Sequence, residues 1–470
     1  MSIDEAASAA LATASPAPAT SAPALVHRPG RWIDNWDAED TLQWNSGGKA
    51  IARRNLQWSI ACEFLGFVVW QLWSIVVVYL PAAGFTFSTS QIFWLISMPS
   101  LVGATLRIPY TFMVPRLGGR NWTIISALLL LIPTIGLGLC VSNPETPFGV
   151  MLAVAALAGF GGGNFASSMA NITFFFPARE KGWALGLNAA GGNLGAAVAQ
   201  LVVPIAVALG AAATLDLPLA GWIWVPLILA AAFGAWKFMD NLSSARSDLA
   251  GSLAAVREPH LWIMALLYIG TFGSFIGFAG VFPKLIVDSF PAFSTIAMGP
   301  ATLSLAFLGP LVGSLARPFG GRMADRFGGA AITVCAFAVM AAVALAVVWT
   351  LPLADFWLFL GLFLVLFAAA GAGNGATYRM IPVIFARRGA AAGSELRESV
   401  STGRKSAAAL GLISAVGAYG GFLIPQVLNA SKGASGSYDG AFYGFVGGYV
   451  LMLAVTWFFY LRRSSTLGKV

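Results

Sequence analysis

Two arginines lie inside long apolar stretches of the chain, and their chemistry demands a partner. Arg107 lies in the stretch 91–114 and Arg317 in the stretch 298–321, and neither stretch contains an acid. A charge at mid-membrane costs at least about 2.5–3.5 kcal/mol, so it persists only where it faces a cavity or a partner. A guanidinium is planar, stays ionised and donates two parallel hydrogen bonds. We therefore expect a small, planar anion between them. The alternative is pairing with a distant acid, or reaching to the membrane surface.

Few other residues offer chemistry. Glu63 lies about two turns into the first apolar stretch. It could carry a proton, or it could pair with a basic residue, which is the favoured interpretation. Arg379 is a candidate for that partner or for a charge at a gate. The three cysteines and two histidines lack the spacing of a metal site or a disulfide framework. The chain also lacks a nucleophile–base set, a cofactor motif and a phosphate loop, so we expect no metal, no cofactor and no enzyme activity.

Composition indicates the environment of these residues. Of the 470 residues, 58% are hydrophobic and 10% are charged, with a mean hydropathy of +0.78. Because a soluble protein carries about 25% charged residues, we expect an all-α integral membrane protein. Twelve stretches reach the length of about 20 residues that a spanning helix requires. They are 56–80, 91–114, 121–142, 147–176, 181–210, 219–239, 260–287, 298–321, 329–351, 355–386, 404–429 and 440–461.

A polar segment divides these stretches into six plus six. Residues 240–259 form the expected cytoplasmic linker between an N-terminal bundle over 56–239 and a C-terminal bundle over 260–461. The flanking segments contain no long apolar stretch. We expect a disordered tail at 1–30, an interfacial cytoplasmic segment with spaced tryptophans at 31–55, and a short cytoplasmic tail at 462–470.

The two halves share a repeat, in which position 317 is displaced from position 107 by 210 residues. At this offset Gly103–Arg107 aligns with Gly313–Arg317, and Gly161–Asn164 aligns with Gly371–Asn374. The segment Arg116–Gly119 likewise meets Arg326–Gly329. A parallel repeat of six spans is the arrangement of the major facilitator folds. It predicts that the two arginines face each other across a central cavity.

The basic residues indicate the orientation. If the N-terminus is cytoplasmic, the outer loops carry only Lys284 and Lys432. The inner segments then carry Arg53, Arg54, Arg116, Arg120, Arg179, Lys181, Arg246, Arg257, Arg322, Arg326, Arg387, Arg388, Arg404, Lys405, Arg462 and Arg463. This asymmetry predicts that both termini are cytoplasmic. It also accounts for the net charge of +8 without nucleic acid, for which we expect no role.

Small residues gather in spans four, five, ten and eleven. Glycines allow helices to approach closely in lipid and could also let a helix bend during a conformational change; the sequence does not separate these roles. The residues singled out for packing are Gly161, Gly163, Asn164, Gly192, Gly371, Gly373, Asn374 and Gly417. Between spans eight and nine, Gly320–Gly329 resembles the loop motif of the facilitator superfamily. Its Asp325 and Arg326 are therefore candidates for gating.

Several long blocks together resemble one family. They are Gly159–Pro177, Leu185–Asn188 with Gly192–Gly195, Leu106–Tyr110, Thr271–Phe278, Ala409–Gly417, and Asn35–Asp40 with Ile51–Leu56. These blocks closely resemble the nitrate/nitrite porters of the NarK type, over about residues 31 to 461. The resemblance implies transport of nitrate and nitrite across a bacterial inner membrane, in nitrate assimilation or anaerobic respiration. A monomer is compatible with the sequence.

The resemblance also implies a substrate site. In that family two arginines hold the anion, which corresponds to Arg107 and Arg317, and aromatic rings sandwich it. The matching residues here are Phe165, Tyr268 and Phe272, with Asn193 as a hydrogen-bond donor. Two features depart from the pattern: Pro318 directly follows the second arginine, and Glu63 occupies a position expected to be apolar.

The scarcity of membrane acids favours nitrate/nitrite antiport by rocking of the two halves around the anion. Proton-coupled nitrate symport is the alternative, with Glu63 as its candidate proton site. A membrane sensor or scaffold is a third class, but it would need a signalling domain that the short terminal segments do not provide.

Overall fold

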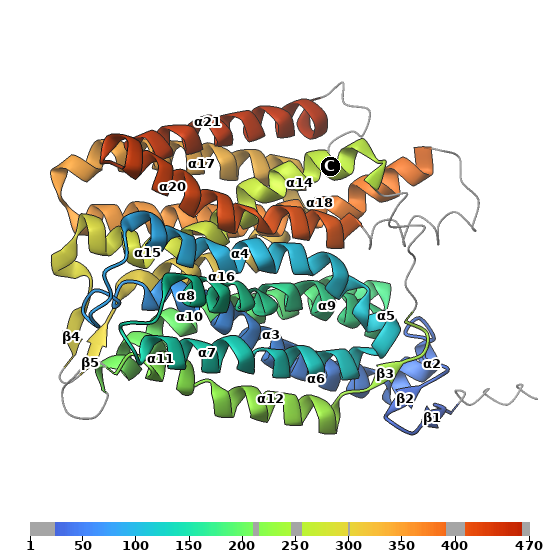
Figure 1. The fold of residues 1–470 in the computed structure, drawn as a ribbon. Helices are drawn as coiled ribbons and strands as arrows, with labels where there is room; N and C mark the ends of the chain where they lie inside the picture. Colours follow the sequence, from blue (N-terminus) through green and yellow to red (C-terminus); the bar gives the residue numbers. More distant parts are fainter. Residues whose placement is uncertain (1–23, 210–215, 246–255, 299–300, 392–408, 463–470) are drawn as a thin grey trace, which may run out of the picture.

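The computed structural model describes residues 24–209, 216–245, 256–298, 301–391 and 409–462. In Figure 1 the helices run roughly side by side along one direction, with the N-terminal half (blue to green) below and the C-terminal half (yellow-green to red) above. Residues up to about 240 form the lower half and those from about 259 form the upper half. We call the end with strands β1, β2 and β3 the sheet end, and the end with β4 and β5 the hairpin end.

Six helical spans make up the N-terminal half. The first begins with α2 (Thr41–Gln43) and a π-helical turn (Trp44–Gly48) before α3. Asp40 starts it, since its carboxylate accepts hydrogen bonds from the backbone of Leu42 and Gln43. The main helices are α3 (Lys49–Val76), α4 (Thr89–Thr111), α5 (Met113–Leu117), α6 (Gly119–Leu129), α7 (Leu131–Val141), α8 (Phe148–Leu157), α9 (Gly159–Phe175), α10 (Ala178–Ala208), α11 (Leu219–Trp222) and α12 (Val225–Phe238).

The C-terminal half repeats this plan. Its seventh span is built from α14 (Pro259–Tyr268), a π-helical turn (Ile269–Gly273) and α15 (Ser274–Ser289). The remaining spans are α16 (Leu308–Phe327), α17 (Gly329–Thr350), α18 (Phe356–Ala391), a helix over Ala409–Ser435 that includes α20 (Gly420–Ser435), and α21 (Asp439–Thr456) with its closing turn Trp457–Leu461.

Eleven helices in the described part of the chain are long and apolar enough to cross a membrane. Helix α16 is absent from that set although its 20 residues lie between the seventh and ninth spans. It carries four charged residues, which lower its hydropathy: Arg317, Arg322, Asp325 and Arg326. With α16 the fold is the expected all-α membrane protein of twelve spans in two halves.

The eighth span differs from the predicted one. The stretch expected at 298–321 was placed too early, because residues 296–303 pair as the antiparallel hairpin β4 (Ile296–Met298) and β5 (Ala301–Leu303). The helix instead begins at Leu308 and continues to Phe327. Apolar residues run through both segments, so composition does not separate the hairpin from the helix. Gly299 and Pro300, a turn-favouring pair, were the signal for the break.

The N-terminal segment is also more ordered than predicted. Strand β1 (His27–Arg28) pairs with β2 (Trp32–Ile33), which pairs in parallel with β3 (Asn241–Leu242). The expectation of a disordered tail up to residue 30 is therefore wrong for the strand residues; residues 1–23 of that tail lie outside the described residues. The linker expected at 240–259 likewise begins with a strand, and its residues 246–255 lie outside the described part.

Glycines at equivalent positions allow close helix packing in both halves. A Cβ atom at Gly161 would lie 2.0 Å from the carbonyl oxygen of Gly66, and one at Gly371 would lie 2.1 Å from that of Gly313. Separations this short exclude any larger residue without backbone movement. In the repeat register Gly161 and Gly371 are equivalent, so both halves use the same position of the fourth and tenth spans for close helix packing.

Candidate functional site

Arg107 is fully buried and contacts both halves of the molecule. It lies on α4, and its Nε donates to the carbonyl oxygen of Gly162 at 3.0 Å. Its Nη1 donates to the carbonyl oxygen of Ser414, in the C-terminal half, at 2.8 Å. Its Nη2 is buried without a hydrogen-bond partner in the described structure. Backbone carbonyls thus orient the guanidinium but do not neutralise its charge.

Arg317, from the C-terminal half, lies over the same aromatic ring as Arg107. It lies on α16, is buried, and its Nη1 has no hydrogen-bond partner among the described residues. Both guanidiniums lie over the ring of Phe165, with Cζ-to-centroid distances of 4.6 Å for Arg107 and 5.8 Å for Arg317. Neither arginine forms an ion pair with an acid within the described residues. The predicted alternative, pairing with a distant acid, is therefore wrong for this structure.

The three predicted aromatic residues are buried and stack in a row beside the arginines. The ring centroids of Phe165 and Phe272 are 6.0 Å apart, and those of Phe272 and Tyr268 are 5.4 Å apart. Phe272 also lies 4.9 Å from the Arg107 guanidinium. The π-helical turn Ile269–Gly273 carries Phe272, and such irregular turns are frequent at functional sites. The rings and the arginines therefore form one cluster.

Asparagine side chains add buried polar atoms that lack partners. Asn193 on α10 is 1% exposed, and its Oδ1 has no hydrogen-bond partner among the described residues. The repeat-related Asn164 and Asn374 are buried too. The Oδ1 and Nδ2 atoms of both side chains also lack a hydrogen-bond partner in the described structure. Buried polar atoms are normally satisfied by protein, water or a ligand. The three asparagines lie on α9, α10 and α18, which pack against the arginine-bearing helices α4 and α16, and this favours a polar ligand or ordered water there.

The remaining glycines of the prediction make space for specific side chains. A Cβ at Gly417 would lie 2.3 Å from the ring of Tyr268, and one at Gly163 would lie 2.9 Å from the ring of Tyr110. A Cβ at Gly192 would lie 2.5 Å from Oε1 of Glu63, and one at Gly373 would lie 2.9 Å from Ala336. Gly192 and Gly417 therefore position the acid and one aromatic ring as well as helices.

Glu63 forms no ion pair with a basic residue in the described part of the chain, which corrects the favoured sequence interpretation. Its carboxylate is 1% exposed and belongs to a network on α3, α9 and α10. Oε2 accepts hydrogen bonds from the Ser168 hydroxyl and from Nδ2 of Asn188, the latter at 2.7 Å. The packing of α9 and α10 against α3 places a hydroxyl donor and an amide donor beside the carboxylate, where a cation was expected.

Arg379 pairs with Asp325 instead of Glu63. Its Nε lies 2.5 Å from Oδ1 of Asp325, and both side chains are about half exposed. Asp325 and Arg326 occupy the last turn of α16 and not a loop, and the Arg326 guanidinium lies 5.1 Å from the ring of Phe327. The ion pair joins α16 to α18 at the sheet end.

Two aromatic residues of the cluster were missed by the sequence analysis. The ring of Trp70 lies 5.5 Å from the Arg107 guanidinium, and that of Tyr378 lies 5.6 Å from the Arg317 guanidinium. Tyr378 follows Asn374 by four positions, as Ser168 follows Asn164, so the repeat register could have identified it. Trp70 is one of 16 tryptophans, and nothing in its sequence context distinguishes it.

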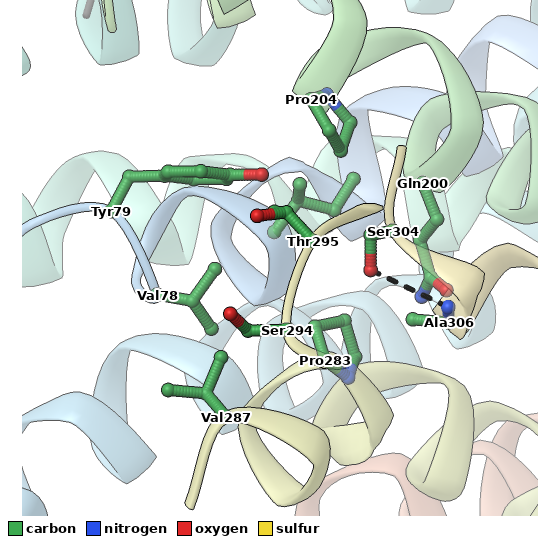
Figure 2. A pocket seen from close by; sticks show the side chains of 11 residues that line it. Val78, Tyr79, Gln200, Pro204, Pro283, Val287, Ser294, Thr295, Ser304 and Ala306 are labelled. Carbon is green, nitrogen blue, oxygen red and sulfur yellow. Dashed lines mark hydrogen bonds between the residues drawn. The ribbon is translucent and has the colours of Figure 1, made fainter. Parts of the chain in front are cut away.

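A cavity of about 180 Å³ lies beyond the cluster, toward the hairpin end (Figure 2). It is lined by residues from the end of α3 and the turn that follows it, from α10 and α15, and from the segments 294–295 and 304–306, among them Tyr79, Pro204, Ser294 and Ser304. Gln200 also lines it, and its Nε2 donates to the carbonyl oxygen of Ala279 at 2.6 Å. Gln200 follows Asn193 by seven residues, about 10 Å along the helix. This contact joins α10 of the N-terminal half to α15 of the C-terminal half.

Comparisons with known proteins agree with this architecture. Residues 62–395 match the family model of the Major Facilitator Superfamily. The chain also resembles the solved structure of a D-xylose-proton symporter, with a TM-score of 0.65 and 14% identity, over 87% of this chain and 97% of that one. At that identity the likeness concerns the fold.

Two relatives are similar along almost their whole length. The chain is 43% identical to the nitrate/nitrite transporter NarU of Escherichia coli (strain K12), covering 92% of this chain and 96% of NarU. It is 38% identical to the probable nitrate/nitrite antiporter NarK2 of Thermus thermophilus, covering 93% of this chain and 98% of that protein.

Proposed function

Because the chain belongs to the major facilitator superfamily, and within it to the nitrate/nitrite porters of the NarK type, we propose that it exchanges nitrate for nitrite across the membrane. The observation that carries this proposal is the pair Arg107 and Arg317. They are buried, lie over one ring, and lack an acidic partner among the described residues.

The anion binds between the two guanidiniums in this proposal. Each arginine has an unpartnered terminal nitrogen, Nη2 on Arg107 and Nη1 on Arg317, so each can donate to one oxygen of a planar oxyanion. Phe165 and Phe272 offer flat faces beside it, with Tyr268 behind Phe272. Asn193 supplies an amide to the same ligand. All of these groups come from one chain, so a monomer suffices.

Exchange follows from the charge of this site. Without an anion, two positive charges approach each other in a medium of low dielectric constant, and their repulsion opposes closure of the halves. A bound anion offsets that repulsion, so the loaded carrier reorients more readily than the empty one. Movement of nitrate in one direction is thereby tied to movement of nitrite in the other.

Closure at each end involves separate contacts. At the hairpin end the Gln200–Ala279 hydrogen bond links the halves and must break for the cavity to reach the anion. At the sheet end we assign Asp325 and Arg326 to gating, because the exposed Asp325–Arg379 ion pair can exchange partners as α16 moves. From the excess of basic residues at the sheet end we infer that this end and both termini face the cytoplasm of a bacterium, with the spans in its inner membrane.

Counterflow in proteoliposomes tests the proposal. Vesicles loaded with unlabelled nitrate should accumulate labelled nitrite, and vesicles loaded with chloride should not. The matched control is the protein with Arg317→Gln, which keeps a polar, hydrogen-bonding side chain but shortens it and removes its charge. Accumulation that is equal with nitrate and chloride inside would overturn exchange, and full activity of the control would overturn the site.

A further inference from the structure

A buried acid with one free oxygen stands beside the proposed anion site. Oε2 of Glu63 accepts hydrogen bonds from Ser168 and Asn188, whereas its Oε1 is buried with no hydrogen-bond partner in the described structure. Asn188 also donates to the Ser168 hydroxyl at 2.6 Å. The network fixes one oxygen of the carboxyl and leaves the other available to hold a proton.

Among the residues that the structure describes, no cation lies within ion-pair distance of Glu63. Helices α9 and α10 face it with Ser168, Asn188 and Gly192, none of which titrates. On the α12 side, the neighbouring Cys62 thiol donates to a backbone carbonyl. The ionisable groups that act on Glu63 from a distance are the arginines of the site, Arg107 and Arg317, together with Tyr378. The charge of Glu63 is thus coupled to the charges that hold the anion.

A polar stripe connects Glu63 with the sheet end. Asn55, Ser59 and Glu63 follow one another at intervals of four residues on α3, so they share one face of the helix, and all three are at most 2% exposed. The hydroxyls of Ser59 and Ser168 are 2.8 Å apart, and Ser168 reaches Glu63. At the other end of the stripe, Asn55 donates to Asp240 at 2.9 Å. The stripe is a polar route through otherwise apolar packing.

We propose that Glu63 binds a proton together with the anion, so that the carrier moves an anion accompanied by a proton as well as exchanging anions. This rests on the proposed function of the arginine site. The step is a simple protonation: an O–H bond forms on Glu63 with a proton taken from water on one side, and it breaks when that proton returns to water on the other side.

The negative charges of Glu63 and of the bound anion repel each other, which determines the sign of the coupling between proton binding and anion binding. An ionised Glu63 repels the anion and offsets part of the positive potential that the two arginines provide to it. A protonated Glu63 has neither effect. An anion in the site therefore favours the proton on Glu63, and by reciprocity the proton favours the anion by the same factor. Couplings of this kind range from about 5-fold to about 150-fold, and we expect about 10-fold tighter anion binding when Glu63 is protonated.

Nitrate affinity as a function of pH tests this inference. Nitrate binding to the purified protein should tighten about 10-fold as the pH falls from about 9 to about 5, the range over which buried carboxyl groups titrate. Glu63→Gln, which can keep a hydrogen bond to Ser168, should bind at every pH as tightly as the wild type does at low pH. Glu145→Gln makes the same chemical change in an exposed loop and should retain the wild-type slope.

A direct measurement covers the case in which Glu63→Gln fails to fold. Nitrate added to the wild-type protein in weakly buffered solution should remove protons from the solution, as a pH-indicator dye records, and chloride should not. A flat wild-type affinity, an unchanged slope in Glu63→Gln, or the absence of proton uptake would each overturn the inference. The absence of nitrate binding at every pH would instead overturn the proposed function itself.

Discussion

Two groups of arginines in this protein have opposite environments. At the sheet end, Arg31 and Arg54 share the buried carboxylate of Asp240, each with its Nη2 2.7 Å from an oxygen. In the centre, Arg107 and Arg317 lie over aromatic rings, and Arg107 also donates to two backbone carbonyls; neither has a carboxylate within ion-pair distance among the described residues. Both groups are held in place by hydrogen bonds or ring contacts, but among the described residues only the first has a carboxylate partner.

The difference indicates that the arginines around Asp240 stabilise the fold, whereas the central arginines serve the anion site. The pairs around Asp240 connect the N-terminal segment and strand β3 to α3, since Arg31 lies just before β2 and Arg54 lies on α3. Such pairs hold segments together and need no ligand. The central arginines retain an uncompensated charge at a depth where it costs free energy, which is what an anion site requires.

The largest effect is expected from giving a central arginine the partner that the outer arginines have. Ser414→Asp places a carboxylate on the residue whose carbonyl oxygen accepts from Arg107. An internal ion pair would occupy the guanidinium, so we expect at least about 100-fold weaker nitrate binding, equivalent to loss of one or two charge-assisted hydrogen bonds. Ser414→Asn has nearly the same shape without the charge. Equal affinity in the two variants would show that the charge of Arg107 is not what binds the anion.

Removing the acid at the sheet end should affect folding and not binding. Asp240→Asn leaves Arg31 and Arg54 without their shared carboxylate. Loss of one partner of a buried pair costs about 3–5 kcal/mol, and we expect about 2–3 kcal/mol here because both arginines are partly exposed and can reach water. Thermal unfolding in detergent should show a lower Tm with unchanged nitrate affinity. A loss of affinity at full stability would contradict the separation of the two regions.

An intermediate effect is expected for the ring that lies between the central arginines. Phe165→Leu removes a cation–π contact with both guanidiniums, each worth about 0.5–2 kcal/mol, so nitrate affinity should fall at least about 5-fold. Phe93→Leu is the matched control, because Phe93 is equally buried on α4 but packs against Tyr438. Similar affinities for the two variants would remove Phe165 from the site.

The smallest effect is expected at the exposed pair of Arg28 and Asp34. The Arg28 guanidinium, at 2.5 Å, and then the Ser243 hydroxyl hold the pKa of Asp34 below its usual range. A lowered pKa of an acid contributes stability above its ordinary value of about 3.9 and loses that contribution as the pH falls through the lowered value. Since the pair is exposed to water, Asp34→Asn should leave Tm at neutral pH unchanged. A clear fall in Tm would mean that β1 matters more to the fold than its exposure indicates.

The sequence predicted the features that depend on one helix or on the repeat. Apolar length predicted the spans, and the offset between Arg107 and Arg317 predicted that they meet. Features that depend on packing between helices were not predicted. Glu63 accepts hydrogen bonds from Ser168 and Asn188 because α9 and α10 pack on α3 there. Arg379 pairs with Asp325 on α16 and not with Glu63. The hairpin at 296–303 was missed because its residues are as apolar as those of the helix that follows.

The most direct test of the account is nitrate affinity in two variants, Arg107→Lys and Arg317→Lys, measured on purified protein beside Arg54→Lys as the matched control at the sheet end. Lysine keeps the charge but loses the planar fork of donors. If the anion binds between the two central guanidiniums, each of the first two variants should bind nitrate at least about 10-fold more weakly, and Arg54→Lys should bind it as the wild type does. Unchanged affinity in either central variant would contradict the two-arginine site.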